Sequence, residues 1–151
     1  MNLTENVSLK ELTKSESATR FGISNEPTEE ALSNLQKLAT HILQPVRDHF
    51  GKPLIITSGY RSPELCLKIG SSIKSQHCLG IAVDCEVLGV PNKELADWVV
   101  NNLEYDQVIL EFWTPEQINS GWVHISYNKS GNRKMYLRAF KSNNRVVYEV
   151  L

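Results

Sequence analysis

The stretch SQHCLGIAVD, residues 75–84, is the part of the chain that most directly indicates both fold and chemistry. It contains His77 and Asp84, separated by small and apolar residues that allow the backbone to bend between them. A second histidine, His124, follows far downstream in the strand-like segment WVHISY, residues 122–127. Two imidazoles and one carboxylate are the ligand set of an open metal site, in which three protein groups leave one position for water. The pattern indicates a zinc hydrolase.

Three cysteines, Cys66, Cys78 and Cys85, offer a different set of metal ligands. In a chain without a secretory signal, free thiols in a reducing compartment are the simplest account of an odd number of cysteines. Asp84 and Cys85 are neighbours on an extended segment, so their side chains point to opposite faces. We therefore do not expect a thiolate to share the metal with Asp84.

The same ligand types also occur in the facial triad of non-haem iron oxygenases, which is a different class of enzyme. Those sites usually place the first histidine and the acid one residue apart on a strand. His77 and Asp84 are much further apart in this chain, so zinc is the expected metal.

Length and composition favour one globular domain with one hydrophobic core, since the chain has 151 residues, of which 41% are hydrophobic. The formal net charge is −1 and no basic run occurs, so we expect no nucleic-acid partner. The first residues, MNLTEN, lack the charged and apolar regions of a secretory signal, and no apolar stretch is long enough for a membrane span. The expectation is a monomer that is made in the cytoplasm and contacts no membrane.

The order of the predicted elements indicates an α+β fold. Residues 1–27 form a polar N-terminal arm with a short helix near 8–12, and residues 28–151 form the domain. Thr28 is a suitable N-cap for a helix that continues to Phe50, with a kink or restart at Pro45. Further helices are expected from Ser62 to Gly70 and after an N-cap at Asn92, and strands at 54–58, 81–87, 107–112, 122–127, 134–140 and 145–150. Helices come first and strands accumulate later, which predicts a mostly antiparallel sheet.

Four separated motifs of the chain occur in the order found in a known family. They are SGYRSP at 58–63, SQH at 75–77 with Gly80, Ala82 and Asp84, YDQVI at 105–109 and WVHIS at 122–126. Together they resemble the zinc D-Ala-D-Ala carboxypeptidase family, and most closely its short, single-domain branch of phage peptidoglycan endopeptidases.

The resemblance implies roles for individual residues of this chain. His77, Asp84 and His124 would bind Zn²⁺, which is the expected cofactor. Arg61 would act in catalysis by holding a substrate carboxylate or the developing oxyanion, and Ser75 would line the substrate pocket or support a ligand. The implied fold is a small α+β domain of the hedgehog and DD-peptidase type, whose sheet carries the zinc site.

The chain departs from the family in the position of the general base. Relatives often have a glutamate three residues before the last histidine, where this chain has Gly121. Glu111 ends a strand that is expected to pair beside His124, and it is the first candidate for the base. Glu116, in the loop that follows, is the second.

The resemblance further implies a zinc metallopeptidase that hydrolyses peptide bonds in the stem peptides of peptidoglycan. Its action as a D,D-carboxypeptidase or as an endopeptidase, including that of a phage endolysin, would use the same metal chemistry. Such a protein would reach the cell wall after release from the cytoplasm, or as part of a virion. The alternative is a non-catalytic, zinc-containing module of the same fold that binds the cell wall or belongs to a virion.

Overall fold

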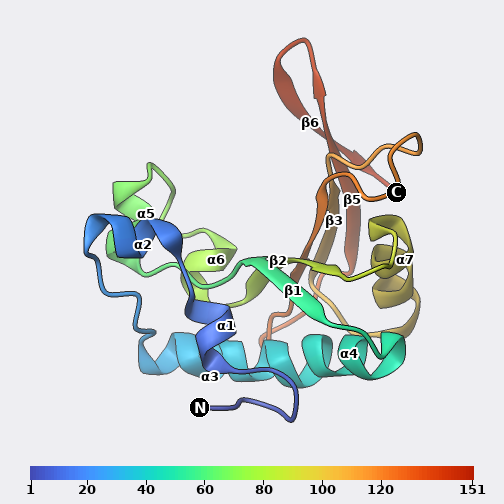
Figure 1. Cartoon of the computed structure of the whole chain (residues 1–151). Coiled ribbons are helices and arrows are strands. Elements are labelled where there is room, and N and C mark those ends of the chain that lie inside the picture. The colour runs from blue at the N-terminus through green and yellow to red at the C-terminus, as the bar shows by residue number, and fades with distance from the viewer.

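The structure, a computed structural model, describes all residues from 1 to 151 and combines several short helices with one sheet (Figure 1). The helices are α1 (Leu9–Thr13), α2 (Glu16–Phe21), α3 (Glu29–Leu38), the π-helical turn η1 (Ala39–Leu43), α4 (Gln44–Phe50), α5 (Pro63–Lys68), α6 (Gln76–Leu79) and α7 (Asn92–Asn102). The strands are β1 (Leu54–Ser58), β2 (Ala82–Val87), β3 (Gln107–Glu111), β4 (Trp122–Ser126), β5 (Met135–Ser142) and β6 (Arg145–Val150). None of the helices combines the length and the apolar character that crossing a membrane would require.

The six strands form one mixed sheet in the order β1-β2-β4-β3-β5-β6. All neighbouring strands are antiparallel except β3 and β5, which are parallel, so the prediction of a mostly antiparallel sheet is wrong in this respect. The connection after β4 explains the difference. The end of β4 pairs with the start of β3, Ser126 opposite Gln107, and a short loop brings β5 to that same end on the far side of β3. Strand β5 must then run in the direction of β3.

The two faces of the sheet have different roles because side chains alternate along each strand. One face carries the apolar strand residues Val83, Cys85, Val108, Leu110, Val123 and Ile125, all buried in the main core. Helices α3, α4 and α7 supply the other half of that core, and Figure 1 shows α3 and α4 running together beneath the sheet. The opposite face carries Asp84, Ile109 and His124 at paired positions of β2, β3 and β4. The candidate site therefore lies on the face that these helices leave open.

The long first helix contains the irregularity that the sequence predicts near Pro45. Helices α3 and α4 are joined by η1, in which the N–H of Gln44 donates to the carbonyl of Ala39, five residues earlier. Pro45 has no N–H to offer the preceding turn, and a single π turn inside an α-helix is a local irregularity of the hydrogen-bond pattern. The helix continues through this turn and buries Leu38, Ile42 and Val46 without interruption.

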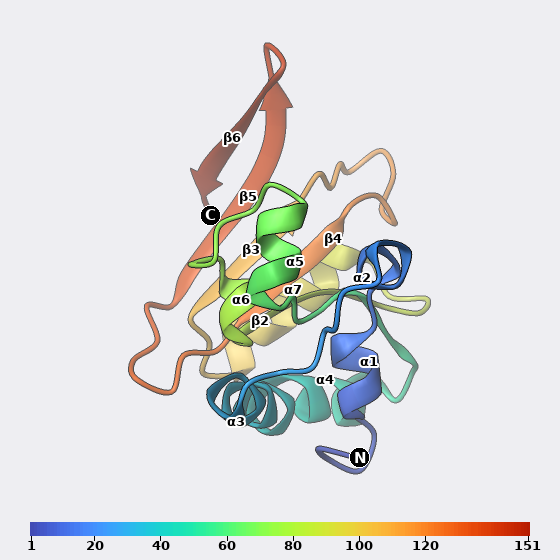
Figure 2. The same cartoon turned by 90° about the vertical axis from the view of Figure 1, so that its left-hand side faces the viewer.

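The N-terminal residues pack onto the body and support the segment that follows β1. Leu3, Val7 and Leu12 belong to the main hydrophobic core. The N–H of Tyr60 donates to the carbonyl of Leu12 at 2.6 Å, and a Cβ at Gly59 would overlap that same carbonyl. Figure 2 looks onto this side of the molecule, where α1 and α2 lie in front together with α5 and α6. Only glycine permits this close approach of α1 to the segment after β1.

The last two strands form the predicted hairpin, which projects beyond the rest of the molecule (Figure 1). Asn143 and Asn144 form its two-residue turn with φ of 52° and 63°. Asparagine tolerates this left-handed conformation better than most residues, and such turns match the twist of a hairpin.

The start of α7 differs by one residue from the expectation. Pro91 occupies the N-cap position and Asn92 is the first helical residue. The Asn92 amide donates instead to the carbonyl oxygens of Ser120 at 2.9 Å and Gly121 at 3.1 Å. The side chain that was expected to cap the helix therefore holds the segment that leads into β4.

Removal of the Asn25 side chain should destabilise the protein, because this residue ties the N-terminal segment to the segment after β1. Its amide donates to the carbonyl oxygens of Thr13 at 2.7 Å and Tyr60 at 2.9 Å, and accepts from the N–H of Ser62 at 2.7 Å. We expect Asn25→Ala to lower the free energy of unfolding by about 1–3 kcal/mol in urea denaturation. Asn119→Ala, at an exposed loop position, is the matched control and should change little; equal effects would contradict the assignment.

Candidate metal centre

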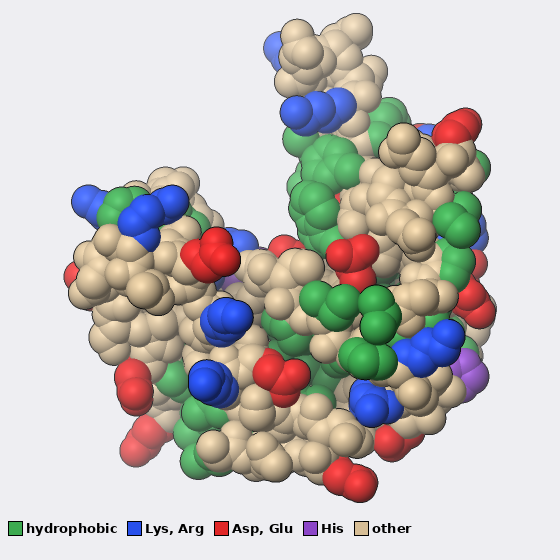
Figure 3. All heavy atoms as spheres, viewed as in Figure 1, with side chains coloured by type: hydrophobic (Ala, Val, Ile, Leu, Met, Phe, Trp, Pro, Cys, Tyr) green, Lys and Arg blue, Asp and Glu red, His purple; other side chains and the backbone are tan.

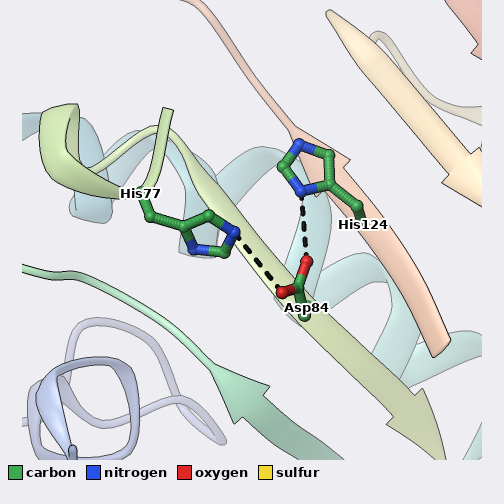
Figure 4. Close-up of side chains that lie close together, drawn as sticks. All are labelled: His77, Asp84 and His124. Atoms are coloured by element: carbon green, nitrogen blue, oxygen red, sulfur yellow. Dashed lines mark hydrogen bonds and ion pairs between the residues drawn. The ribbon is translucent and has the colours of Figure 1, made fainter. Parts of the chain in front are cut away.

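His77, Asp84 and His124 come together from three elements, α6, β2 and β4 (Figure 4). Asp84 and His124 are directly opposite each other on antiparallel strands, so their side chains share one face of the sheet. His77 Nε2 lies 3.4 Å from Asp84 Oδ2, and His124 Nδ1 lies 3.1 Å from Asp84 Oδ1. One ligand atom from each residue lies within 4.8 Å of the others. The cluster could hold a metal ion.

The sequence around His77 explains how the histidine reaches the sheet. Ser75 caps α6, and its hydroxyl accepts from the N–H of His77 at 3.3 Å. Gly80 ends the helix with φ of +78°, and a Cβ there would approach the carbonyl oxygen of Ala31 to 2.8 Å. Glycine is therefore required both for the turn and for the close contact with α3. This short turn lets one helix residue and one strand residue reach the same point.

Burial and charge keep the cluster ready to bind a cation. His77 and His124 are both buried, with only 6% and 8% of each residue exposed. Burial by itself raises the pKa of Asp84, but the hydrogen bonds and charges of His124 and His77 outweigh it and hold that pKa well below its usual range. Asp84 is therefore an ionised carboxylate at neutral pH.

Each histidine has its second ring nitrogen fixed by an oxygen atom that can only accept. His77 Nδ1 lies 2.9 Å from the carbonyl oxygen of Gly59, and His124 Nε2 lies 2.7 Å from Gln76 Oε1. In a neutral imidazole these nitrogens carry the proton, so a bound metal would be ligated by the other nitrogen of each ring, His77 Nε2 and His124 Nδ1. In this structure the same two nitrogens face the carboxylate oxygens of Asp84. Such outer partners are typical of metal-binding histidines, whose orientation and basicity they set.

Asp106 fixes the orientation of the Gln76 amide. Its carboxylate is buried, with the residue only 1% exposed, and it accepts from Gln76 Nε2 at 3.2 Å. A carboxylate cannot donate, so the amide oxygen of Gln76 must face His124. Arg133 pairs with Asp106 through its Nε at 3.1 Å and Nη2 at 2.8 Å. Burial raises the pKa of Asp106, but these contacts with Arg133 outweigh it, so its pKa is lowered and the carboxylate stays charged.

Sequence reasoning missed the connection from Arg133 through Asp106 and Gln76 to His124. It included Asp106 and Gln76 in the family motifs but gave neither residue a role at the metal site. The available signal was the position of Gln76, directly before His77 in the central motif.

The ligand set fits zinc. Two neutral imidazoles and a carboxylate are typical of catalytic Zn²⁺ sites, and three protein ligands leave one position open toward the surface. The cysteines form no part of the cluster: Cys66, Cys78 and Cys85 are free and buried. Burial raises the pKa of Cys85, which lies opposite Val123 on the core face of the sheet. The expectation that Cys85 and Asp84 point to opposite faces is confirmed.

The triad opens into a cavity of about 490 Å³ that is lined by Arg61, Ser75 and Glu111, among others. Arg61 is held through its backbone and its side chain: its backbone N–H donates to the carbonyl of His77 at 3.2 Å, and its Nη2 donates to Ser58 Oγ at 2.8 Å. The bond to Ser58 orients the guanidinium, which has further N–H groups available in the cavity that the triad also lines. Ser75 both lines the cavity and caps α6.

Glu111 lies on the same face of the sheet as the ligands. Its strand pairs with β4 so that Ile109 is opposite His124 and Glu111 is opposite Trp122, two residues further along. Burial, and then the charge of Asp84, raise the pKa of Glu111, while His124, Trp122 and His77 lower it in part. Its carboxyl is therefore more basic than an exposed glutamate. Glu116 is exposed in the loop between β3 and β4 and does not line the cavity.

The structure explains why the chain has glycine where relatives often have glutamate. Gly121 has φ of +66°, and a Cβ there would overlap the carbonyl oxygen of Glu111. No other residue fits this position while β3 and β4 keep their pairing. A glutamate at position 121 is thus excluded by the same strand pairing that puts Glu111 on the face of the ligands.

Comparison with known proteins places the chain in a family. The model of the family described as Peptidase M15 matches residues 5–126 of the 151. The chain belongs to the Peptidase M15 family, whose members are zinc-dependent peptidases. A search of curated proteins found no match.

Loss of the Gln76 amide should weaken zinc binding, because His124 would lose the acceptor that fixes its tautomer. We expect Gln76→Met to raise the dissociation constant for Zn²⁺ by about 10–100-fold. Competition with a chromogenic chelator measures this constant without any assay of activity.

Gln107→Met is the matched control. Gln107 lines the same cavity, but its side chain forms no hydrogen bond with His77, Asp84 or His124. Its zinc affinity should stay within about twofold of the original protein, well below the loss expected at Gln76. Equal zinc affinity of the two variants would show that Gln76 does not support His124.

Proposed function

We propose that this protein is a zinc peptidase that hydrolyses peptide bonds in the stem peptides of peptidoglycan, as a D,D-carboxypeptidase or an endopeptidase. The observation that supports it best is the position of Arg61 and Glu111, which line the same cavity as the triad of His77, Asp84 and His124. A structural zinc site would be closed by four ligands and would not need this cavity. The family supports the peptidase activity; the peptidoglycan substrate is our inference from the motifs.

The triad would hold zinc, and zinc when bound supplies Lewis acidity that activates water and polarises an amide carbonyl. In this proposal Glu111 moves the proton. Its carboxylate accepts the proton of the attacking water as the C–O bond forms, and delivers it to the leaving amine as the C–N bond breaks. Proton and electron pairs balance without any further reactant.

In the same proposal Arg61 binds negative charge on the substrate. Its planar guanidinium can hold two oxygen atoms at once, which suits a terminal carboxylate or the oxyanion that develops at the scissile carbonyl. The hydrogen bond from Nη2 to Ser58 orients this group before substrate arrives. In a stem peptide that ends in D-alanine, the terminal carboxylate is the group that Arg61 would bind.

The oligomeric state of the protein and the place where it acts are part of the same proposal. We infer a monomer that is made in the cytoplasm and acts on the cell wall after release, as a phage endolysin or as a virion component would. The similarity of motifs to the single-domain phage branch supports this inference.

Digestion of defined peptidoglycan fragments tests the proposed function. The zinc-loaded protein is incubated with purified stem peptides and cross-linked dimers, and the products are weighed by mass spectrometry. Loss of one terminal alanine indicates a carboxypeptidase, and separation of cross-linked dimers indicates an endopeptidase. Binding of the fragments without any cleavage would contradict the proposal and favour a wall-binding module of the same fold.

Replacement of Glu111 by glutamine should remove the general base while zinc stays bound. Glutamine keeps the shape of the side chain but cannot take up a proton, so we expect turnover to fall by about 10²–10⁴-fold. Glu116→Gln is the control, because Glu116 is exposed and does not line the cavity, and it should change turnover little. Near-normal turnover of Glu111→Gln would place the base elsewhere.

Replacement of Arg61 by lysine should reduce turnover without loss of zinc or of stability. A lysine supplies one point charge in place of a planar fork, so we expect kcat/KM to fall by about 10²-fold. Zinc content and melting temperature should remain close to those of the original protein. A parallel loss of stability would instead show that Arg61 serves mainly to hold Ser58 and the segment around it.

A further inference from the structure

The hairpin of β5 and β6 forms one wall of the hollow above the metal triad. Figure 3 shows this hollow between the hairpin and the opposite side of the molecule, with apolar side chains along the inner face of the hairpin. The hairpin begins at Met135, beyond the residues that match the Peptidase M15 family. The wall is thus a part of this chain that the family likeness does not describe.

Strand register places Tyr148 in the same row as the proposed general base. Glu111 is paired with Ala139, and Ala139 is paired with Tyr148. Neighbouring strands are about 4.8 Å apart, so the backbone of Tyr148 lies roughly 10 Å from that of Glu111. Ala139, between them, is too small to fill the space. Tyr148 also lines the cavity into which the triad opens.

The inner face of the hairpin continues an apolar strip that starts beside the ligands. Ile109, opposite His124, forms a small buried cluster with Leu137 and Ala139 on the cavity face of the sheet. Tyr148 and Val150 continue this face on β6, and they are 56% and 76% exposed. An exposed apolar surface next to a polar active site is typical of a binding surface.

We propose that Tyr148 binds the substrate peptide about three residues from the scissile bond. This inference rests on the proposed function, and it names the part of the substrate that the hairpin recognises. A distance of roughly 10 Å corresponds to about three residues of extended chain. The ring of Tyr148 would pack on small apolar side chains, such as the methyl groups of alanine, and its hydroxyl could bond to the peptide backbone. Arg61 and Lys74, which line the same cavity, suit the carboxylates of such a peptide.

The proposal makes the importance of Tyr148 depend on the length of the substrate. A dipeptide bound at the triad cannot reach the hairpin, whereas a tetrapeptide or pentapeptide can. We expect Tyr148→Ala to raise KM by about 5–30-fold for pentapeptides and to leave KM for dipeptides unchanged. The value of kcat should change by less than about twofold for either substrate, because Tyr148 contacts no reacting atom.

Val147→Ala is the matched control, since Val147 is an exposed apolar residue on the opposite face of the same strand. It should change KM for neither substrate, and Tyr148→Phe, which keeps the ring, should retain most of the affinity. Melting temperatures of all three variants should match that of the original protein. Equal effects of Tyr148→Ala and Val147→Ala on pentapeptides, or an equal effect of Tyr148→Ala on dipeptides and pentapeptides, would overturn the proposal.

Calorimetric binding of the same peptides separates this inference from the proposed function. If the protein binds pentapeptides but does not cleave them, the proposed catalytic function fails. Binding of pentapeptides by Tyr148→Ala with a higher Kd than by Val147→Ala would then still support the role of Tyr148. If the protein cleaves peptides normally but the effect of Tyr148→Ala does not depend on peptide length, the proposed role of Tyr148 is wrong and the catalytic function stands. If the zinc-loaded protein neither binds nor cleaves any peptide, both are wrong.

Discussion

The opposition of Asp84 and His124 across strands β2 and β4 is the constraint on which the rest of the site depends. A slip of one residue in this register would turn His124 toward the core and Val123 toward the cavity. The buried residues of β2 and β4 prevent such a slip, since Val83, Val123 and Ile125 are completely inaccessible to solvent. The hydrophobic core on one face of the sheet thereby sets the geometry of the ligands on the other.

The surrounding structure supports this pair through groups that touch no metal. The carbonyl of Gly59 and the amide of Gln76 fix the two imidazoles, and each depends on a further element. Gly59 packs closely against the carbonyl of Leu12 in α1. The Gln76 amide donates to buried Asp106, which directly precedes β3. Gly121 lets β3 and β4 approach closely enough to bring Glu111 to the cavity. The N-terminal segment and the late strands thus act on one site through backbone contacts.

Local patterns in the sequence predicted most of the helices and strands, because caps, prolines and alternation act over a few residues, but they did not predict α2 or α6. The grouping of His77, Asp84 and His124 came from the residue types and from the resemblance to a family, not from a local pattern. The sequence did not predict that β5 is parallel to β3, since that depends on which side of β3 the loop after β4 passes. The roles of Gln76, Asp106 and Asn92 were also missed. Their hydrogen bonds join residues that are 48, 30 and 28 positions apart, respectively, and no local pattern records such contacts. The glycine at position 121 was visible, but its reason, the close carbonyl of Glu111, was not.

Anomalous scattering at the zinc edge, from crystals grown with stoichiometric zinc, tests the central claim most directly. The account predicts one strong peak bonded to His77 through Nε2, to the carboxylate of Asp84 and to His124 through Nδ1. Gln76 should remain within hydrogen-bond distance of His124 Nε2 in that structure. A peak at Cys66 or Cys78, or coordination of His124 through Nε2 with Gln76 displaced, would contradict the account.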